Sequence, residues 1–212
     1  MRLPERFFPE KKELSVIAYF PFSSDDSLGE WKEKVLRKKV KYSVISSPAE
    51  SYVRAVSNGT CSSMYHTLKL NADIRPVLSW KWRVVGFPEK KYSDDLKSRE
   101  EDDFAARMYV IFPALFFANS RVLEYIWAQD LGIGTISSSP YSDNIKLIVL
   151  RSGPTENGAW KKEERDIYED YVSAFHARPK YKIGAVAFMC DSDSTGSSAE
   201  AHFDDIKIFI KK

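Results

Sequence analysis

Cysteine and histidine are scarce in this chain of 212 residues. The two cysteines, Cys61 and Cys190, are too few for a disulfide framework, and the sequence leaves open whether they pair. The three histidines lie far apart, and neither an HExxH nor a CxxC motif occurs. Because protein zinc sites draw on clustered ligands of these types, we do not expect an ordinary zinc centre.

The chain also lacks an excess of charge of one sign and a long apolar run. It carries 32 Lys and Arg against 30 Asp and Glu, a formal net charge of +2. This balance argues against a nucleic-acid-binding protein, which usually presents a strongly basic face. No apolar run approaches the roughly 18 residues of a membrane span, so no membrane-spanning segment is predicted.

Aromatic residues are abundant, at 14% of the chain, and hydrophobic residues make up 43%. That content supplies a substantial core, and the length suits one large β domain. We expect residues 1–13, which are charged and hold two prolines, to form an N-terminal arm. Residues 14–212 are then a single domain.

Short segments of alternating or continuous apolar character, separated by turn residues, predict strands along most of the chain. Residues 161–177 have apolar positions at helical spacing and predict one helix, whereas residues 129–143 predict a long loop. This pattern favours an all-β fold, a two-sheet antiparallel β-sandwich of jelly-roll type with one packed helix. The predicted strands are 14–22, 40–45, 52–56, 64–70, 77–85, 104–112, 122–128, 145–150, 183–190 and 202–210.

Two predicted strands place polar side chains opposite an apolar face. Lys81 and Arg83 alternate with large apolar residues, and Arg107 shares a face with Tyr109. A guanidinium fork and a ring on one strand face suit a sugar or a carboxylate, so these four residues are candidate ligand contacts. The alternative for Arg107 is a cross-strand salt bridge.

Three groups of aspartates stand at the ends of predicted strands. Asp102 and Asp103 open one strand, and Asp191 and Asp193 follow another in a DSDSTG sequence. An EF-hand is excluded there because His202 occupies the position of the bidentate glutamate, which leaves a different cation or ligand site, or an Asx-turn loop.

Asp204 and Asp205 form the third group, at the entry to the last strand. An inward-facing carboxylate needs a compensating partner, and we consider a structural calcium ion, Lys81 or Arg107 for that role.

The tryptophans divide between core and candidate surface. Trp80 and Trp82 share an apolar strand face, which predicts core packing. Trp127 precedes the Gly- and Ser-rich segment 129–143, so we expect its ring at a cleft edge, with Tyr141 as a further candidate.

Several segments together resemble a known family. LSWKWRV (78–84), EDDFAARMYVIF (101–112), EYIWA (124–128), IYEDYVSAF (167–175) and AVAFMCDSDSTGSSAEAHFDDIKI (185–208) occur in the order found in the bacterial family called domain of unknown function 3047. The resemblance implies a β-sandwich similar to galactose-binding-like carbohydrate-binding modules. It also implies an aspartate near a structural calcium, which transfers only to Asp204 and Asp205. Members are commonly exported, which implies a periplasmic or extracellular location with a leader outside this chain. A cytoplasmic location is the alternative.

The sequence therefore favours a non-catalytic module, a monomer or weak homodimer, that binds glycan or cell-envelope polysaccharide. One alternative is a structural or protein-interaction domain of the envelope. A second is a polysaccharide hydrolase or lyase that uses Asp102, Asp103, Arg107 and Asp191. A serine nucleophile is not expected, because the sequence has no GxSxG motif.

Overall fold

The computed structural model describes residues 14–91 and 95–211, so the predicted arm at 1–13 lies outside the described residues. One sheet contains β1 (Leu14–Phe20), β3 (Lys41–Ser46), β4 (Ser51–Asn58), β6 (Val77–Gly86), β11 (Lys161–Asp166) and β13 (Ser198–Lys211). The other contains β2 (Lys32–Val35), β5 (Ser62–Leu70), β7 (Ala106–Phe112), β8 (Arg121–Ala128), β9 (Ile136–Ser139), β10 (Ser142–Ser152) and β12 (Ile183–Met189). The helices are α1 (Ile167–Phe175) and the 3₁₀ turns η1 (Asp25–Glu30), η2 (Ala72–Ile74), η3 (Phe117–Asn119) and η4 (Glu156–Gly158).

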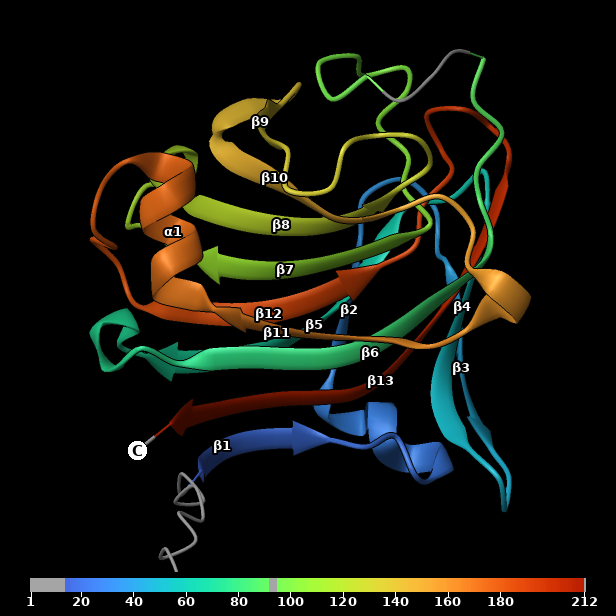
Figure 1. Cartoon of the computed structure of the whole chain (residues 1–212), viewed down its shortest axis with the longest axis horizontal. Helices are drawn as coiled ribbons and strands as arrows, with labels where there is room; N and C mark the ends of the chain where they lie inside the picture. Colours follow the sequence, from blue (N-terminus) through green and yellow to red (C-terminus); the bar gives the residue numbers. More distant parts are fainter. Residues whose placement is uncertain (1–13, 92–94, 212) are drawn as a thin grey trace, which may run out of the picture.

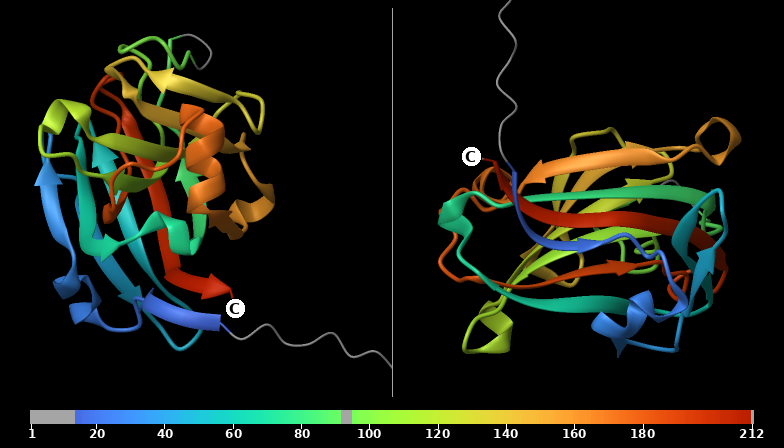
Figure 2. Two further views of the ribbon diagram at one scale, coloured as in Figure 1. Left: turned by 90° about the vertical axis from the view of Figure 1, so that its left-hand side faces the viewer. Right: turned by 90° about the horizontal axis from the view of Figure 1, so that it is seen from below.

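These strands form the two-sheet sandwich that the sequence predicts (Figure 1). The six-stranded sheet has the order β11-β6-β13-β4-β3, with β1 paired to β13, and the seven-stranded sheet has the order β2-β5-β12-β7-β8-β10-β9. The two sheets stack face to face, and α1 lies at one end of them (Figure 2). None of the helices in the described part of the chain combines the length and apolarity needed to cross a membrane.

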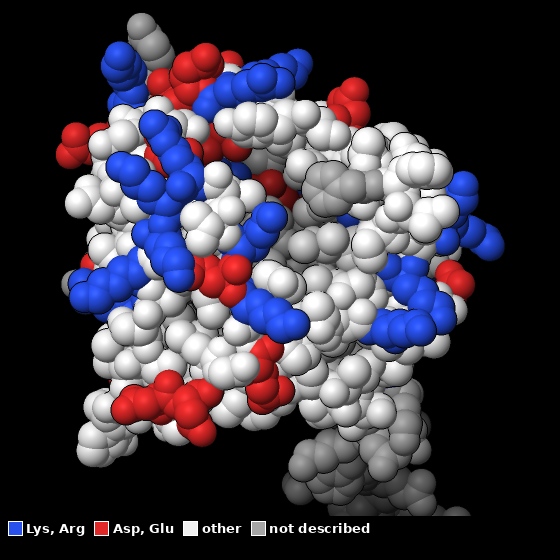
Figure 3. Space-filling view, turned by 180° about the vertical axis from the view of Figure 1, so that it is seen from behind, with Lys and Arg blue, Asp and Glu red and all other residues white. Residues whose placement is uncertain are grey.

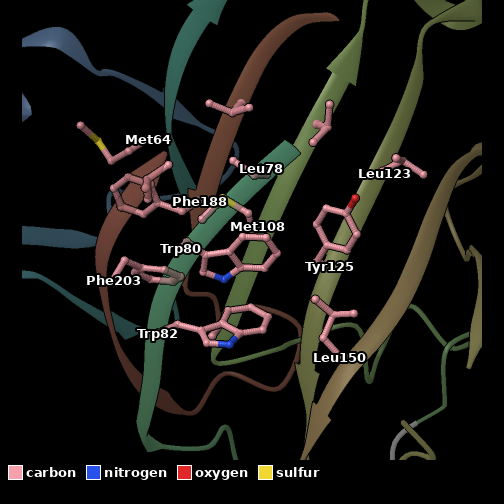
Figure 4. Close-up of a cluster of buried hydrophobic side chains, with 14 of the residues drawn as sticks. Met64, Leu78, Trp80, Trp82, Met108, Leu123, Tyr125, Leu150, Phe188 and Phe203 are labelled. Atoms are coloured by element: carbon pink, nitrogen blue, oxygen red, sulfur yellow. The ribbon is translucent and has the colours of Figure 1, made fainter. Parts of the chain in front are cut away.

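The core consists of large side chains that the two-residue period directs between the sheets. In β6, Leu78, Trp80 and Trp82 are fully buried, while the residues between them face outward. Their rings meet those of the facing sheet, with ring centroids 5.4 Å apart for Trp80 and Tyr125 (Figure 4). Edge-to-face and tilted ring pairs of this kind add stability beyond the burial of their area.

The two-residue period also shows why β8 contributes to the core. Tyr125 and Trp127 share its inner face, and Trp82 packs against Trp127 with centroids 5.6 Å apart. The tryptophans therefore join the sheets to each other at their centre.

Two details of the seven-stranded sheet differ from the sequence prediction. β9 lies inside the predicted loop 129–143, because its short serine-rich stretch pairs with β10 at the sheet edge. β8 and β10 run parallel, whereas every other strand pair is antiparallel in the described structure. The chain between them spans β9 and its flanking turns, which gives it the length to return for a parallel pairing.

The predicted helix begins six residues later than expected, because Lys161–Asp166 forms strand β11 beside β6. Glu163 faces inward there and accepts a hydrogen bond from Trp82 Nε1 at 3.0 Å. Asp166 caps α1 by accepting from the backbone N–H groups of Tyr168 and Glu169. The helix ends at His176, which adopts a left-handed backbone conformation with φ of 52°.

Pro113 packs closely against Gly184 of β12, which leaves no room for a side chain there. A Cβ added there would lie 2.4 Å from Pro113 Cγ and 2.6 Å from Pro113 Cδ, atoms of a rigid ring. We expect Gly184→Ala to lower the free energy of unfolding by about 1–3 kcal/mol, measured by urea denaturation. The control is Gly29→Ala, which meets nothing within 4 Å. Equal stability of the two variants would contradict the close approach.

Candidate functional site

A pocket of about 500 Å³ opens on the outer face of the seven-stranded sheet. This face points away from the viewer of Figure 1, and from behind the molecule is hollowed there, with acidic atoms visible in its depth (Figure 3). The lining side chains come from the turn after β2, from β5, β7, β8 and β12, from the start of β10 and from the segments around 102, 140 and 191–194. They are Leu36, Arg37, Cys61, Ser63, Asp102, Arg107, Tyr109, Ile111, Val122, Glu124, Ser139, Tyr141, Ile145, Ala187, Met189, Asp191, Asp193 and Ser194.

Strand alternation explains which side chains reach the pocket. Met108, Val110 and Phe112 of β7 point into the core, so Arg107, Tyr109 and Ile111 point outward. The lining divides into two parts. Aliphatic side chains such as Ile111, Val122 and Ile145 form one wall, and charged side chains gather at the other end.

The segment between β6 and β7 closes one side of this face. Leu96 and Phe104 pack over Ile126, Leu147 and Val149, and together they make a small apolar cluster outside the main core. The cluster places Asp102 at the pocket and buries it.

Arg107 is the centre of the charged end. Its Nε and Nη2 atoms donate to the two carboxylate oxygens of Asp191 at 2.8 and 2.6 Å, a bidentate pair. Its Nη1 donates to Glu124, and its Nη2 also donates to the backbone oxygen of Asp102. All of these residues are less than 10% exposed, so Arg107 is a buried cross-strand ion-pair partner as well as part of the pocket lining.

Burial also sets the pKa values of the acids around Arg107. Desolvation raises the pKa of the Asp191 and Glu124 carboxyls, and the guanidinium of Arg107 opposes that rise. Burial raises the pKa of Asp102 to about 6, with the same opposition from Arg107. The Oδ1 atom of Asp102 is buried and has no hydrogen-bond partner among the described residues.

The DSDSTG segment forms a loop that Asp103 fixes in place. The Asp103 carboxylate accepts from the backbone N–H of Ser194 at 3.1 Å and of Thr195 at 2.6 Å. Ser192 bonds the hydroxyl of Ser57 at 2.7 Å. These bonds fit the Asx-turn interpretation of the DSDSTG segment, in which its polar residues stabilise a loop.

The structure brings four of the predicted ligand contacts together: Arg107, Tyr109, Asp191 and Asp193. It separates the other three from them. Lys81 and Arg83 lie on β6, on the outer face of the opposite sheet. The expectation that Trp127 stands at a cleft edge is wrong, because its ring is 1% exposed and its Nε1 donates to the backbone oxygen of Gly153.

Arg83 is held by its own neighbours on that opposite face. Its guanidinium lies 4.5 Å from the ring centroid of Trp160 and 4.9 Å from that of Tyr52. It also donates to His202 Nδ1 at 2.9 Å and to Glu50 at 3.1 Å. Stacking and hydrogen bonding therefore occupy the side chain.

Lys81 is the cation nearest to Asp204 and Asp205. Its Nζ atom lies 2.5 Å from Asp205 Oδ2 and 3.9 Å from Asp204 Oδ2, and Tyr19 donates its hydroxyl to Asp205 at 2.6 Å. Asp204 Oδ1 is buried without a partner among the described residues. Lys81 is one of the compensating partners considered for this pair, and the calcium ion stays a prediction.

One further group could be weighed as a metal site. Cys61, Asp191 and Asp193 bring ligand atoms within 4.8 Å of one another, the single such group of three found among the described residues. Both oxygens of Asp191 are already bonded to Arg107, and burial raises the pKa of the Cys61 thiol well above its usual range. Since a metal needs a thiolate and free carboxylate oxygens, this group fits a metal poorly. The two cysteines are both free and buried.

Sequence reasoning missed much of the lining. The aliphatic wall carries no signal that separates it from core residues. Glu124 did carry one, because a charged residue in the apolar run EYIWA must face away from Tyr125 and Trp127 and needs a partner.

Residues 29–207 match the family described as "Protein of unknown function (DUF3047)", and the chain belongs to it. No curated protein matches the sequence.

Several solved structures are similar to this chain at low sequence identity. The family 11 carbohydrate-binding module of a cellulosomal cellulase from Clostridium thermocellum is 10% identical, with a TM-score of 0.47 over 96% of this chain and 97% of that chain. The xylan-binding CBM22-1 domain of Paenibacillus barcinonensis Xyn10C is 10% identical, with a TM-score of 0.48 over 95% and 98%. The xyloglucanase domain of NopAA from Sinorhizobium fredii is also 10% identical, with a TM-score of 0.46 over 85% and 93%.

The buried ion pairs of Arg107 predict a large stability effect. We expect Arg107→Met to lower the free energy of unfolding by about 3–5 kcal/mol near neutral pH, because it leaves buried carboxylates without a counter-charge. Arg37→Met is the control, since the Arg37 side chain is 61% exposed. Chemical denaturation measures both, and a loss below about 1 kcal/mol for Arg107→Met would contradict this role.

The pKa of Asp204 predicts a pH effect of defined sign. Burial raises that pKa from 3.8 to about 6, so the folded state binds the proton more tightly than the unfolded state. Asp204 therefore favours folding at low pH, and this contribution is lost as the pH rises through about 6. Without calcium, we expect Asp204→Asn to exceed the wild type in stability by about 1–2 kcal/mol at pH 8 and to equal it below pH 4.

Melting curves at several pH values, recorded in EDTA and in calcium, measure this effect. Asp205→Asn is the control and should be destabilised at neutral pH, because Lys81 and Tyr19 hold the pKa of Asp205 below its usual range. A calcium-induced rise in Tm that Asp204→Asn abolishes would instead support the predicted calcium site.

Proposed function

We propose that the pocket on the seven-stranded sheet binds a glycan, and that the protein is a non-catalytic binding module. The observation that carries this proposal is the division of the pocket into an aliphatic wall and a charged, hydrogen-bonding end. A sugar ring presents the matching surfaces, since its C–H groups form apolar faces and its hydroxyls form a polar edge. The pocket volume of about 500 Å³ also lies within the roughly 300–1,000 Å³ usual for small-ligand sites.

Two tyrosines support the proposal. Tyr141 is 54% exposed and lines the pocket, with the guanidinium of Arg99 5.1 Å from its ring centroid. Tyr109 lines the floor beside Met189. An exposed ring at the rim offers a stacking surface for a sugar face.

The hydrogen-bonding pattern favours binding over hydrolysis. A glycosidase needs two carboxyl groups that are free to donate a proton and to attack or activate water. Asp191 and Glu124 are bonded to Arg107, and Asp103 is bonded to backbone N–H groups of the 191–196 loop. Of the three aspartates considered for catalysis, Asp102, Asp103 and Asp191, only Asp102 retains an unpartnered carboxylate oxygen within the described structure.

The glycan that we propose is a polysaccharide of the cell envelope or surroundings, which implies a periplasmic or extracellular location. The second candidate, a structural or protein-interaction domain, rests on the exposed apolar side chains of β1, where Leu14 and Val16 are 50% and 53% exposed. Light scattering tests it: a dimer that Val16→Lys dissociates would support the second candidate, and a monomer would count against it.

Binding predicts a measurable role for Tyr141. On a glycan array and in affinity gels, we expect the wild-type protein to be retained by at least one polysaccharide. Tyr141→Ala should weaken that binding about fivefold or more, because a stacked ring contributes about 1 kcal/mol. Tyr19→Ala is the control, since Tyr19 has similar exposure on β1 in the other sheet. Folded protein that no polysaccharide retains would overturn the proposed function.

A further inference from the structure

The pocket has more negative than positive side chains. Asp102, Glu124, Asp191 and Asp193 line it together with only two basic residues, Arg37 and Arg107. Arg107 has a buried partner for each of its three guanidinium nitrogens, so its charge is already balanced inside the protein. A ligand therefore meets a surplus of acids at this end of the pocket.

The two arginines also leave few donors for an acidic ligand. Arg37 is the more exposed of them, and its Nη1 donates to the backbone oxygen of Asp193 at 2.8 Å. The same Nη1 lies 3.7 Å from the Asp193 carboxylate. A ligand carboxylate that approached Arg37 here would also approach the neighbouring carboxylates of Asp102 and Asp193, which is electrostatically unfavourable.

Spare acceptors are present at the same end. Asp102 Oδ1 is buried with no hydrogen-bond partner among the described residues. Burial raises the pKa of Asp102 to about 6 although Arg107 Nη2 lies 3.6 Å from Asp102 Oδ2, so a hydrogen bond donated by a ligand to Oδ1 would stabilise the carboxylate. Asp193 is 20% exposed at the side chain, and its longer contact with Arg37 leaves it able to accept as well.

We propose that the pocket takes an amino sugar, with the protonated amine at the Asp102 and Asp193 end and a C–H face on the aliphatic wall. This inference rests on the proposed glycan-binding function and specifies its ligand class. A neutral sugar can donate hydroxyls to the same acceptors, but it gains no charge–charge attraction. A uronic acid brings like charge to the pocket and is excluded.

Calorimetric titration with four oligosaccharides of equal length tests this order. The probes are oligomers of glucosamine, N-acetylglucosamine, glucose and galacturonic acid. We expect glucosamine oligomers to bind at least about tenfold more tightly than the glucose and N-acetylglucosamine oligomers at low salt, and galacturonate oligomers to give no binding. The glucosamine advantage should shrink as salt rises, because screening weakens charge–charge attraction.

Substitutions of the two aspartates test whether they cause the preference for glucosamine oligomers. Asp102→Asn and Asp193→Asn should each reduce the glucosamine advantage over the neutral oligomers severalfold, because an amide oxygen still accepts a hydroxyl hydrogen bond but carries no charge. Asp73→Asn, at an exposed aspartate of η2 outside the pocket lining, is the matched control. Two variants at separate positions keep the test usable if one of them does not fold.

The outcomes separate the two proposals. Binding of neutral or galacturonate oligomers as tight as that of glucosamine oligomers would overturn the amino-sugar inference and leave glycan binding standing. A glucosamine preference that survives in both variants would also overturn it. Failure of all four oligomers and of the wider glycan array would overturn the proposed function itself.

Discussion

The pocket depends on the buried ion pairs of Arg107. This side chain projects from β7 and contacts Glu124 on β8 and Asp191 just after β12, so one guanidinium joins adjacent segments of the seven-stranded sheet. Without it, the acids at the polar end would lie buried with no counter-charge, at a cost of several kcal/mol. With it, charged groups can line a pocket floor that is otherwise apolar.

The sandwich behind the pocket is stabilised by a different kind of interaction. Trp80, Trp82, Tyr125 and Trp127 pack between the sheets and hold the inner faces together. The high aromatic content of the chain is therefore used largely for packing. With the interior filled in this way, strand alternation leaves the outer faces to polar chemistry. The two outer faces differ. On the six-stranded sheet, Arg83 and Lys81 are bonded to neighbouring side chains of the protein, whereas the outer face of the seven-stranded sheet forms the pocket.

The same alternation explains which parts of the site the sequence could predict. The sequence predicts Arg107 and Tyr109 on one face of a strand because the residues that alternate with them, Met108, Val110 and Phe112, are apolar. The Gly- and Ser-rich segment after Trp127 suggests a cleft edge, but the two-residue period that Trp127 shares with Tyr125 puts both rings in the core. The apolar residues at helical spacing begin only at Ile167, so the predicted start of the helix at residue 161 is wrong, and residues 161–166 form β11, in which Glu163 contacts Trp82.

Local periodicity and motifs in a fixed order are enough to predict the β-sandwich, the inner faces of its main strands and the family. The strand order of a sandwich is set by long-range pairing, which places Lys81 and Arg83 on the opposite sheet from Arg107 and Tyr109. Long-range pairing also brings Asp191 to Arg107 and leaves Asp102 with an unpartnered oxygen. Both results depend on side chains that lie far apart in the chain and meet only when the sheets are assembled.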